Sequence, residues 1–593
     1  MADCIKPRLL RAVLLCTGLM VHPVPAAEGR IEIEGIAGEL KQNVLGFLSL
    51  RTTACDAPQW RLRARYRKAE EEIRKALEPF GHYRPRIQGE LFPASGPGTC
   101  WRARFRIDPG PVVHLRRVHV EIQGPAKTDP AFRALLEHDL PHPGEPLRHA
   151  RYESLKRALL NLAQAHGYVE ARFSTHELRV DPGAGTADID LVLVSGPRYR
   201  FGPTHFEQDV LEPRLVTRFL EYRKGAPFDQ ALIEDTQRAL LSSGYFAGVM
   251  IRPAFRASPS HEIPITIELQ PAKRHRYAVG LGYATDIGPR FSVEYENRRI
   301  NRRGHRLRFR ATGSPVKSEA SLVYTLPHGN PAKEYYDLNA GFKHEVTGNT
   351  ASDIARVSFG RSDLLPWDWR QRVFLDLSYE DFDVADQAGA TLLLMAGGAW
   401  NRRRTDDPVH PSRGHRVGIE LRGSAAELVS DVSFLQLAAR GKWIHAVHLF
   451  EPRVKQTRIL LRGDAGTTWV DEVTRLPESI RFFAGGDQSV RGFGYKSLGP
   501  RNAAGEVIGG RHLVTASFEV DQYYFEKWGQ WGLAAFVDAG NAFDRRFDEV
   551  EVGAGLGLRW RAPIGGTIRL DVAFALTEPG TPIRIHFTMG PDL

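Results

Sequence analysis

Residues 272–593 constrain the fold most, because apolar and polar side chains alternate there in one strand-length segment after another. The segment IRIHFTM at 583–589 is typical. The polar positions are rich in Arg and Glu, which suits a watered lumen, while the alternate positions are apolar, which suits lipid. A soluble β-sandwich could also contain such segments, but at about 20 residues per strand and connection the region predicts an all-β transmembrane barrel of about 16 antiparallel strands.

The N-terminus predicts export. Residues 1–26 contain basic side chains, an apolar stretch at 9–21 and a Val-Pro-Ala ending that suits cleavage. A membrane-anchoring helix is the alternative, but the apolar stretch is too short to span a bilayer. We therefore interpret residues 1–26 as a secretory signal peptide.

Between these two regions the chain mixes strand and helix patterns and repeats itself. The interval from Gly81 to Gly167, each of which ends a predicted helix, equals the interval from Gly110 to Gly196, each of which follows a predicted strand. Three copies of a small β-α-α-β-β module explain this spacing better than one large α/β domain. The predicted modules span 27–109, 110–196 and 197–271, and the barrel spans 272–593.

Cleavage after residue 26 removes two of the four cysteines and leaves Cys55 and Cys100. Two cysteines in an oxidising compartment are expected to pair. A metal site is the alternative, but two thiols without nearby partner ligands make a poor one. We predict a structural disulfide in the first module.

Composition excludes several classes of function. The net charge of +10 is spread over the chain without a dominant Lys/Arg run, so no nucleic acid partner is expected. The mean hydropathy of −0.32 argues against a helical membrane protein. The chain has no zinc-protease, nucleotide or nucleophile-elbow motif, so we expect no enzyme activity, no cofactor and no metal. The Gly-rich run at 553–557 lies in a predicted barrel strand, not before a helix.

One Gly-rich segment, 482–495, contains Val-Arg-Gly-Phe at 490–493 between late barrel strands. With this loop, Phe-Val-Asp-Ala-Gly at 536–540, the first strand and turn at 281–290 and the C-terminal residues 587–593, the chain resembles the TamA family of the BamA superfamily. The resemblance covers essentially the whole mature chain. It implies α+β POTRA domains followed by an outer-membrane barrel; three such domains fit TamA, whereas BamA proteins typically have five and two-partner secretion transporters two.

The resemblance implies that the loop motif, Val490, Arg491, Gly492 and Phe493, folds back into the lumen. Alternation along the strands independently places Asp538 and Glu519 on the lumen face. Because a guanidinium binds carboxylates through a planar fork, we predict that Arg491 docks against these two acceptors. The expected role is structural pinning.

A weak lateral seam is predicted where the first and last strands close the barrel. The first strand has almost no side chain on its inner face, and a proline near the end of the last strand cannot donate to the ladder. Ordinary closure, with glycines that permit curvature, is the alternative. The residues assigned to the seam are Gly280, Gly282, Ile585, Phe587, Gly590 and Pro591.

By resemblance, the chain is expected in the outer membrane of a Gram-negative bacterium with its POTRA domains in the periplasm. It would assist insertion or translocation of outer-membrane and autotransporter-type proteins, together with an inner-membrane-anchored TamB-like partner. A two-partner secretion transporter that exports one dedicated client is the alternative, and a passive porin is a third possibility.

Overall fold

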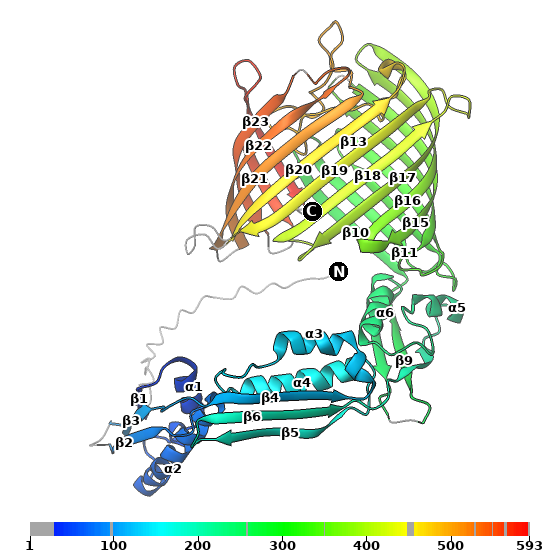
Figure 1. Ribbon diagram of the computed structural model, residues 1–593. Coiled ribbons are helices and arrows are strands. Elements are labelled where there is room, and N and C mark those ends of the chain that lie inside the picture. The colour runs from blue at the N-terminus through cyan, green and yellow to red at the C-terminus, as the bar shows by residue number, and fades with distance from the viewer. Residues whose placement is uncertain are drawn as a thin grey trace, which may run out of the picture. The chain divides into compact units, whose positions relative to one another are not determined.

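The computed structural model describes residues 29–94, 99–256, 259–348, 350–447, 456–526, 529–547, 549–562 and 566–590 (Figure 1). The predicted signal peptide, residues 1–26, and Pro591 of the predicted seam lie outside these ranges. No helix in the described ranges is long and apolar enough to cross a membrane.

The first module follows the predicted β-α-α-β-β order. Its strand β1 lies parallel to β3, which pairs antiparallel with β2. Cys55 and Cys100 form the predicted disulfide, which joins the segment before α2 to the segment before β3. The elements are β1 (Arg30–Glu34), α1 (Gly38–Phe47), α2 (Gln59–Leu77), β2 (Arg86–Phe92) and β3 (Arg102–Asp108).

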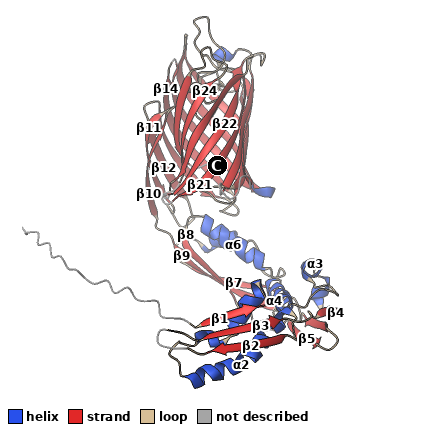
Figure 2. Ribbon diagram, turned by 90° about the vertical axis from the view of Figure 1, so that its left-hand side faces the viewer, coloured by secondary structure: helices blue, strands red, loops and turns tan. Residues whose placement is uncertain are grey.

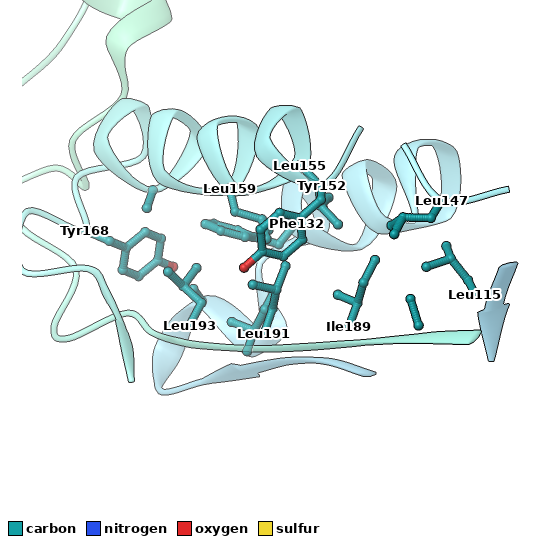
Figure 3. Packing of buried hydrophobic residues seen from close by; sticks show 14 of the residues in the cluster. Leu115, Phe132, Leu147, Tyr152, Leu155, Leu159, Tyr168, Ile189, Leu191 and Leu193 are labelled. Carbon is teal, nitrogen blue, oxygen red and sulfur yellow. The ribbon is translucent and has the colours of Figure 1, made fainter. Parts of the chain in front are cut away.

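The second module repeats this order and strand arrangement. Helices α3 and α4 cover one face of its sheet (Figure 1). Between them and the sheet lies an apolar core in which Phe132, Leu155 and Leu159 contact Ile189 and Leu191 (Figure 3). The elements are β4 (His114–Gln123), α3 (Pro130–Asp139), α4 (His149–Ala165), β5 (Arg172–Asp181) and β6 (Thr186–Val194).

The third module has the sheet order β7-β9-β8. Most of this module belongs to the same compact unit as the barrel, namely residues 203–224, 231–254 and 264–271. Its elements are β7 (Arg200–Glu207), α5 (Pro213–Val216), α6 (Gln230–Ser242), β8 (Phe246–Pro253) and β9 (Glu262–Pro271).

The glycines that suggested a repeat have a common backbone conformation. Gly81, Gly167 and Gly244 have φ of 86°, 81° and 76°, and Gly110 and Gly196 have φ of 70° and 65°. Glycine adopts this left-handed region without the steric penalty that a Cβ imposes. The equal spacing therefore reflects equivalent turns in successive modules.

Sixteen strands close into the predicted antiparallel barrel (Figure 2). They are β10 (His275–Ala284), β11 (Gly288–Asn297), β12 (Arg306–Gly313), β13 (Lys317–Pro327), β14 (Tyr335–Thr347), β15 (Thr350–Leu365), β16 (Trp369–Val384), β17 (Gln387–Thr405), β18 (Arg413–Ser424), β19 (Phe434–Val447), β20 (Gln456–Trp469), β21 (His512–Glu526), β22 (Gly529–Phe543), β23 (Glu551–Arg561), β24 (Thr567–Ala575) and β25 (Ile583–Gly590).

The alternation along each strand separates two surfaces of the barrel wall. On β22, for example, Val537 is 48% exposed on the outer face, whereas Asp538 is fully buried on the inner face. On β25, Ile585 faces outward and His586 is buried. An apolar exterior around a charged interior is the arrangement expected of a barrel that spans a bilayer.

Candidate functional site in the barrel lumen

Residues 485–495, which we name the lumen loop, lie between β20 and β21 and pack against the inner wall. Val490 and Phe493 are buried in an apolar cluster with Ala575 of β24. Gly492 between them has φ of 99°, and a Cβ there would come within 3.0 Å of the Ala575 amide nitrogen. The Val-Arg-Gly-Phe sequence thus supplies two apolar contacts and one close backbone approach, and it directs Arg491 to the wall.

Arg491 makes the predicted contacts with both carboxylates. Its Nε donates to Asp538 Oδ2 at 2.7 Å and one terminal nitrogen donates to Oδ1 at 3.0 Å, so the guanidinium binds Asp538 through two atoms. The other terminal nitrogen donates to Glu519 Oε2 at 2.7 Å. All three side chains are buried, and the guanidinium carbon lies 3.4 Å from the Phe536 ring centroid. Buried, charge-assisted contacts of this kind hold a loop firmly.

Two further residues that sequence analysis missed extend the network. Asp571 on β24 accepts a hydrogen bond at 3.0 Å from the Arg491 nitrogen that also donates to Glu519. Arg559 on β23 donates to Glu519 Oε1 at 2.8 Å. Arg559 also pairs with Asp571. Asp571 lies between Leu570 and Val572, so the alternation that identified Asp538 could have identified it as well.

The seam between β10 and β25 is much shorter than its neighbours. β10 pairs with β11 along its whole length, from His275–Asn297 to Ala284–Gly288. Among the described residues, the only ladder pair between β10 and β25 is Ala284 with Thr588.

One residue beyond that pair adds hydrogen bonds across the seam. The Thr285 amide donates to Phe587 O at 3.1 Å, and the Phe587 amide donates to Thr285 Oγ1 at 2.6 Å. Of the predicted seam residues, Phe587 thus forms hydrogen bonds across the seam. Among the residues that the structure describes, Gly280, Gly282 and Ile585 form no ladder pair across it. Gly590 pairs with Thr567 of β24.

Three side chains meet where the lumen loop passes the seam. The Asp487 amide donates to Asp286 Oδ2 at 2.6 Å, and the Asp487 carboxylate accepts a hydrogen bond from His586. The Gly492 amide donates to the other imidazole nitrogen of His586 at 2.9 Å. Both imidazole nitrogens are thus engaged, so this group offers no free imidazole to a metal ion.

Comparison with known proteins identifies the barrel and the first module of the chain. The Omp85 superfamily domain matches residues 275–592, and the POTRA domain TamA domain 1 matches residues 30–109. The fold resembles that of BamA from Haemophilus ducreyi lacking POTRA domains 1–3, with a TM-score of 0.65 at 16% identity over 81% of this chain and 99% of that one.

Two curated relatives are outer membrane protein assembly factors BamA. The one from Nitratidesulfovibrio vulgaris is 23% identical over 61% of this chain and 47% of its own length. The one from Neisseria meningitidis serogroup B is 23% identical over 68% of this chain and 54% of its own length. The chain therefore spans about half the length of these relatives. With the family model matching more than half of its residues, the chain belongs to the Omp85 superfamily, and its first domain is a POTRA domain of the TamA type.

Proposed function

We propose that this protein is an outer-membrane assembly factor that assists the insertion or translocation of outer-membrane and autotransporter-type proteins. By its TamA-type first domain, we infer that it works with an inner-membrane-anchored, TamB-like partner. Family membership and the BamA relatives support assembly as the general activity.

The seam is the observation that carries this proposal. Beyond the Ala284–Thr588 pair, the backbone of β10 from His275 to Tyr283 has no ladder pairing with the part of the last strand that the structure describes, which ends at Gly590. An unpaired strand edge is a template for another strand, and adding a strand to an exposed edge is an established mode of recognition. A client strand could therefore pair with β10 while the other strand junctions stay closed.

Locking the seam tests the mechanism. Ala284→Cys with Thr588→Cys would crosslink the ladder pair that the described part of the chain forms across it. We expect loss of complementation under oxidising conditions and recovery under reducing conditions. Ala311→Cys with Ala320→Cys, a pair inside the β12–β13 hairpin, is the matched control, and it should complement under both conditions. Full activity with the seam quantitatively crosslinked would rule out opening.

Depletion distinguishes the proposed activity from dedicated secretion. An assembly factor should lower the amounts of several outer-membrane and autotransporter-type proteins when the outer-membrane proteome is compared before and after depletion. Loss of a single exported protein would instead indicate a two-partner secretion transporter. Pull-down of the full chain with its POTRA domains intact tests the TamB-like partner.

A further inference from the structure

We propose that Asp487 is a second anchor of the lumen loop, which holds the seam shut by connecting the turn after β10 to the last strand, β25. The inference rests on the proposed function, because it identifies what controls the opening of the same seam. Asp487 contacts both sides: its amide donates to Asp286, in the β10–β11 turn, and its carboxylate accepts from His586, on β25.

The geometry of His586 makes this contact specific. Its Nε2 accepts a hydrogen bond from the Gly492 amide at 2.9 Å, so the ring proton resides on Nδ1 and is donated to Asp487. His586 and Asp487 are both buried. One imidazole on the last strand therefore contacts the lumen loop at two points, on either side of Arg491.

The contacts of Asp487 lie directly beside the short ladder of the seam. Asp286 follows Thr285, and His586 precedes Phe587, the two residues that exchange backbone hydrogen bonds across the seam. If the loop moves away, β10 and β25 are held within the described residues by the Ala284–Thr588 pair, the hydrogen bonds of Thr285 with Phe587, and the edge-on contact of the Tyr283 and Phe587 rings. The position of the loop and the closure of the seam are consequently coupled.

Arg491 cannot supply this coupling. Its partners Glu519, Asp538 and Asp571 belong to β21, β22 and β24, so none of these contacts crosses the seam. Arg491 binds the lumen loop to the barrel wall. Asp487 instead joins the loop to both sides of the seam, namely β25 and the turn after β10.

The closed arrangement also places two carboxylates side by side, which favours release of the lumen loop from the seam. Asp487 Oδ2 is buried and has no hydrogen-bond partner within the described residues, and the Asp286 carboxylate lies close to it. Burial and the Asp487 carboxylate raise the pKa of Asp286 above its ordinary value. Two adjacent carboxylates repel each other, so the hydrogen bonds of Asp487 must offset this repulsion for the seam to stay closed.

The test measures seam closure without any client. In the full-length protein reconstituted in liposomes, the rate of disulfide formation between cysteines at 284 and 588 reports how often the two edges meet. Asp487→Ala removes the hydrogen bond from His586, worth about 1.5–3 kcal/mol when one partner is charged, but keeps the amide that donates to Asp286, so this rate should fall by up to about tenfold. Asp487→Asn, which retains an acceptor for His586, and Gln488→Ala, at the exposed neighbouring position, should crosslink about as fast as the parent.

Each outcome decides the inference. An unchanged rate in Asp487→Ala overturns it, and so does an Asp487→Asn variant as slow as Asp487→Ala. If Asp487→Ala does not fold, as judged by the heat-modifiable mobility of the barrel, Asp286→Ala replaces it, with slow crosslinking expected and an unchanged rate contradictory. Client assembly is measured separately: slow crosslinking with undiminished assembly would support the anchor and refute the proposed use of the seam.

Discussion

At the scale of single residues, three carboxylates converge on Arg491. Asp538, Glu519 and Asp571 come from three different strands. On each strand the alternation of side chains turns the carboxylate toward the lumen, where it is buried. Buried carboxylates are costly unless they are paired, so the arginine of the loop and the acids of the wall stabilise one another.

Truncation of this arginine should therefore destabilise the barrel. We expect Arg491→Ala to lower the free energy of unfolding by about 3–5 kcal/mol, because it removes the two-atom partner of the buried Asp538 and leaves Glu519 and Asp571 to share Arg559. The measurement is the urea midpoint of the heat-modifiable folded band, together with complementation. Arg440→Ala is the control: this side chain is 81% exposed and its pairing with Asp464 is loose, so its effect should be below about 1 kcal/mol.

A charge swap separates pairing from packing at this site. Arg491→Asp should abolish complementation, and adding Asp538→Arg should restore it in part, because the swapped pair can re-form one contact but not those with Glu519 and Asp571. An Arg491→Ala barrel as stable as the parent would contradict the clamp.

At the scale of elements, helix α3 shows how one side chain determines where a helix starts. Asp129 caps it by accepting a hydrogen bond from the Ala131 amide at 3.1 Å, and its other oxygen pairs with His166 at 3.0 Å. Burial raises the pKa of Asp129, but the Ala131 amide, His166 and Arg198 lower it more, so the pKa lies below the ordinary 3.8.

This lowered pKa predicts a pH dependence. A carboxyl group with a lowered folded-state pKa stabilises the fold above its ordinary pKa, and that stability is lost as the pH falls through the folded-state value. Asp129→Ala should reduce the hydrogen-exchange protection of α3 amides in the full chain by about 1–2 kcal/mol at neutral pH, with the difference shrinking in acid. Glu137→Ala, at an exposed position of α3, should change little, and a pH-independent difference would refute the cap.

At the scale of the whole molecule, the third domain docks on the turn between β11 and β12. The Glu212 amide donates to Arg302 O at 2.9 Å, the Arg306 guanidinium donates to Ser243 O at 2.9 Å, and Tyr245 donates to Gly304 O. Gly304 has φ of 75°, and a Cβ there would come within 2.6 Å of Leu215 Cδ2.

Gly304→Ala should therefore loosen this docking without unfolding the barrel. The strained backbone and the clash should lower the protection of the Glu212 amide by about 1–3 kcal/mol in hydrogen exchange of the reconstituted full chain. Gly348→Ala is the matched control, because a Cβ there meets nothing within 4 Å. Equal protection in both variants would show that the turn tolerates a side chain and that the docking does not depend on it.

The periodicity of the chain by itself determined the architecture of this protein. Alternation assigns each strand residue of the barrel to lipid or lumen without reference to any other strand, which is why Asp538 and Glu519 could be placed on the lumen face from sequence. That Arg491 reaches them followed from the family resemblance of its loop. Spacing of left-handed glycines likewise revealed the repeated modules. Such signals are local, because they depend on one strand or one turn.

Only the tertiary structure decided which residues meet across the lumen and the seam. Asp286, Asp487 and His586 lie far apart in the chain, and nothing local to any of them indicates the other two. The length of the seam likewise depends on how the first and last strands align when sixteen tilted strands close, a property of the whole barrel. Gly280 and Gly282 therefore lie on the edge of β10, while the backbone pairing seen across the seam joins Ala284 and Thr285 to Thr588 and Phe587.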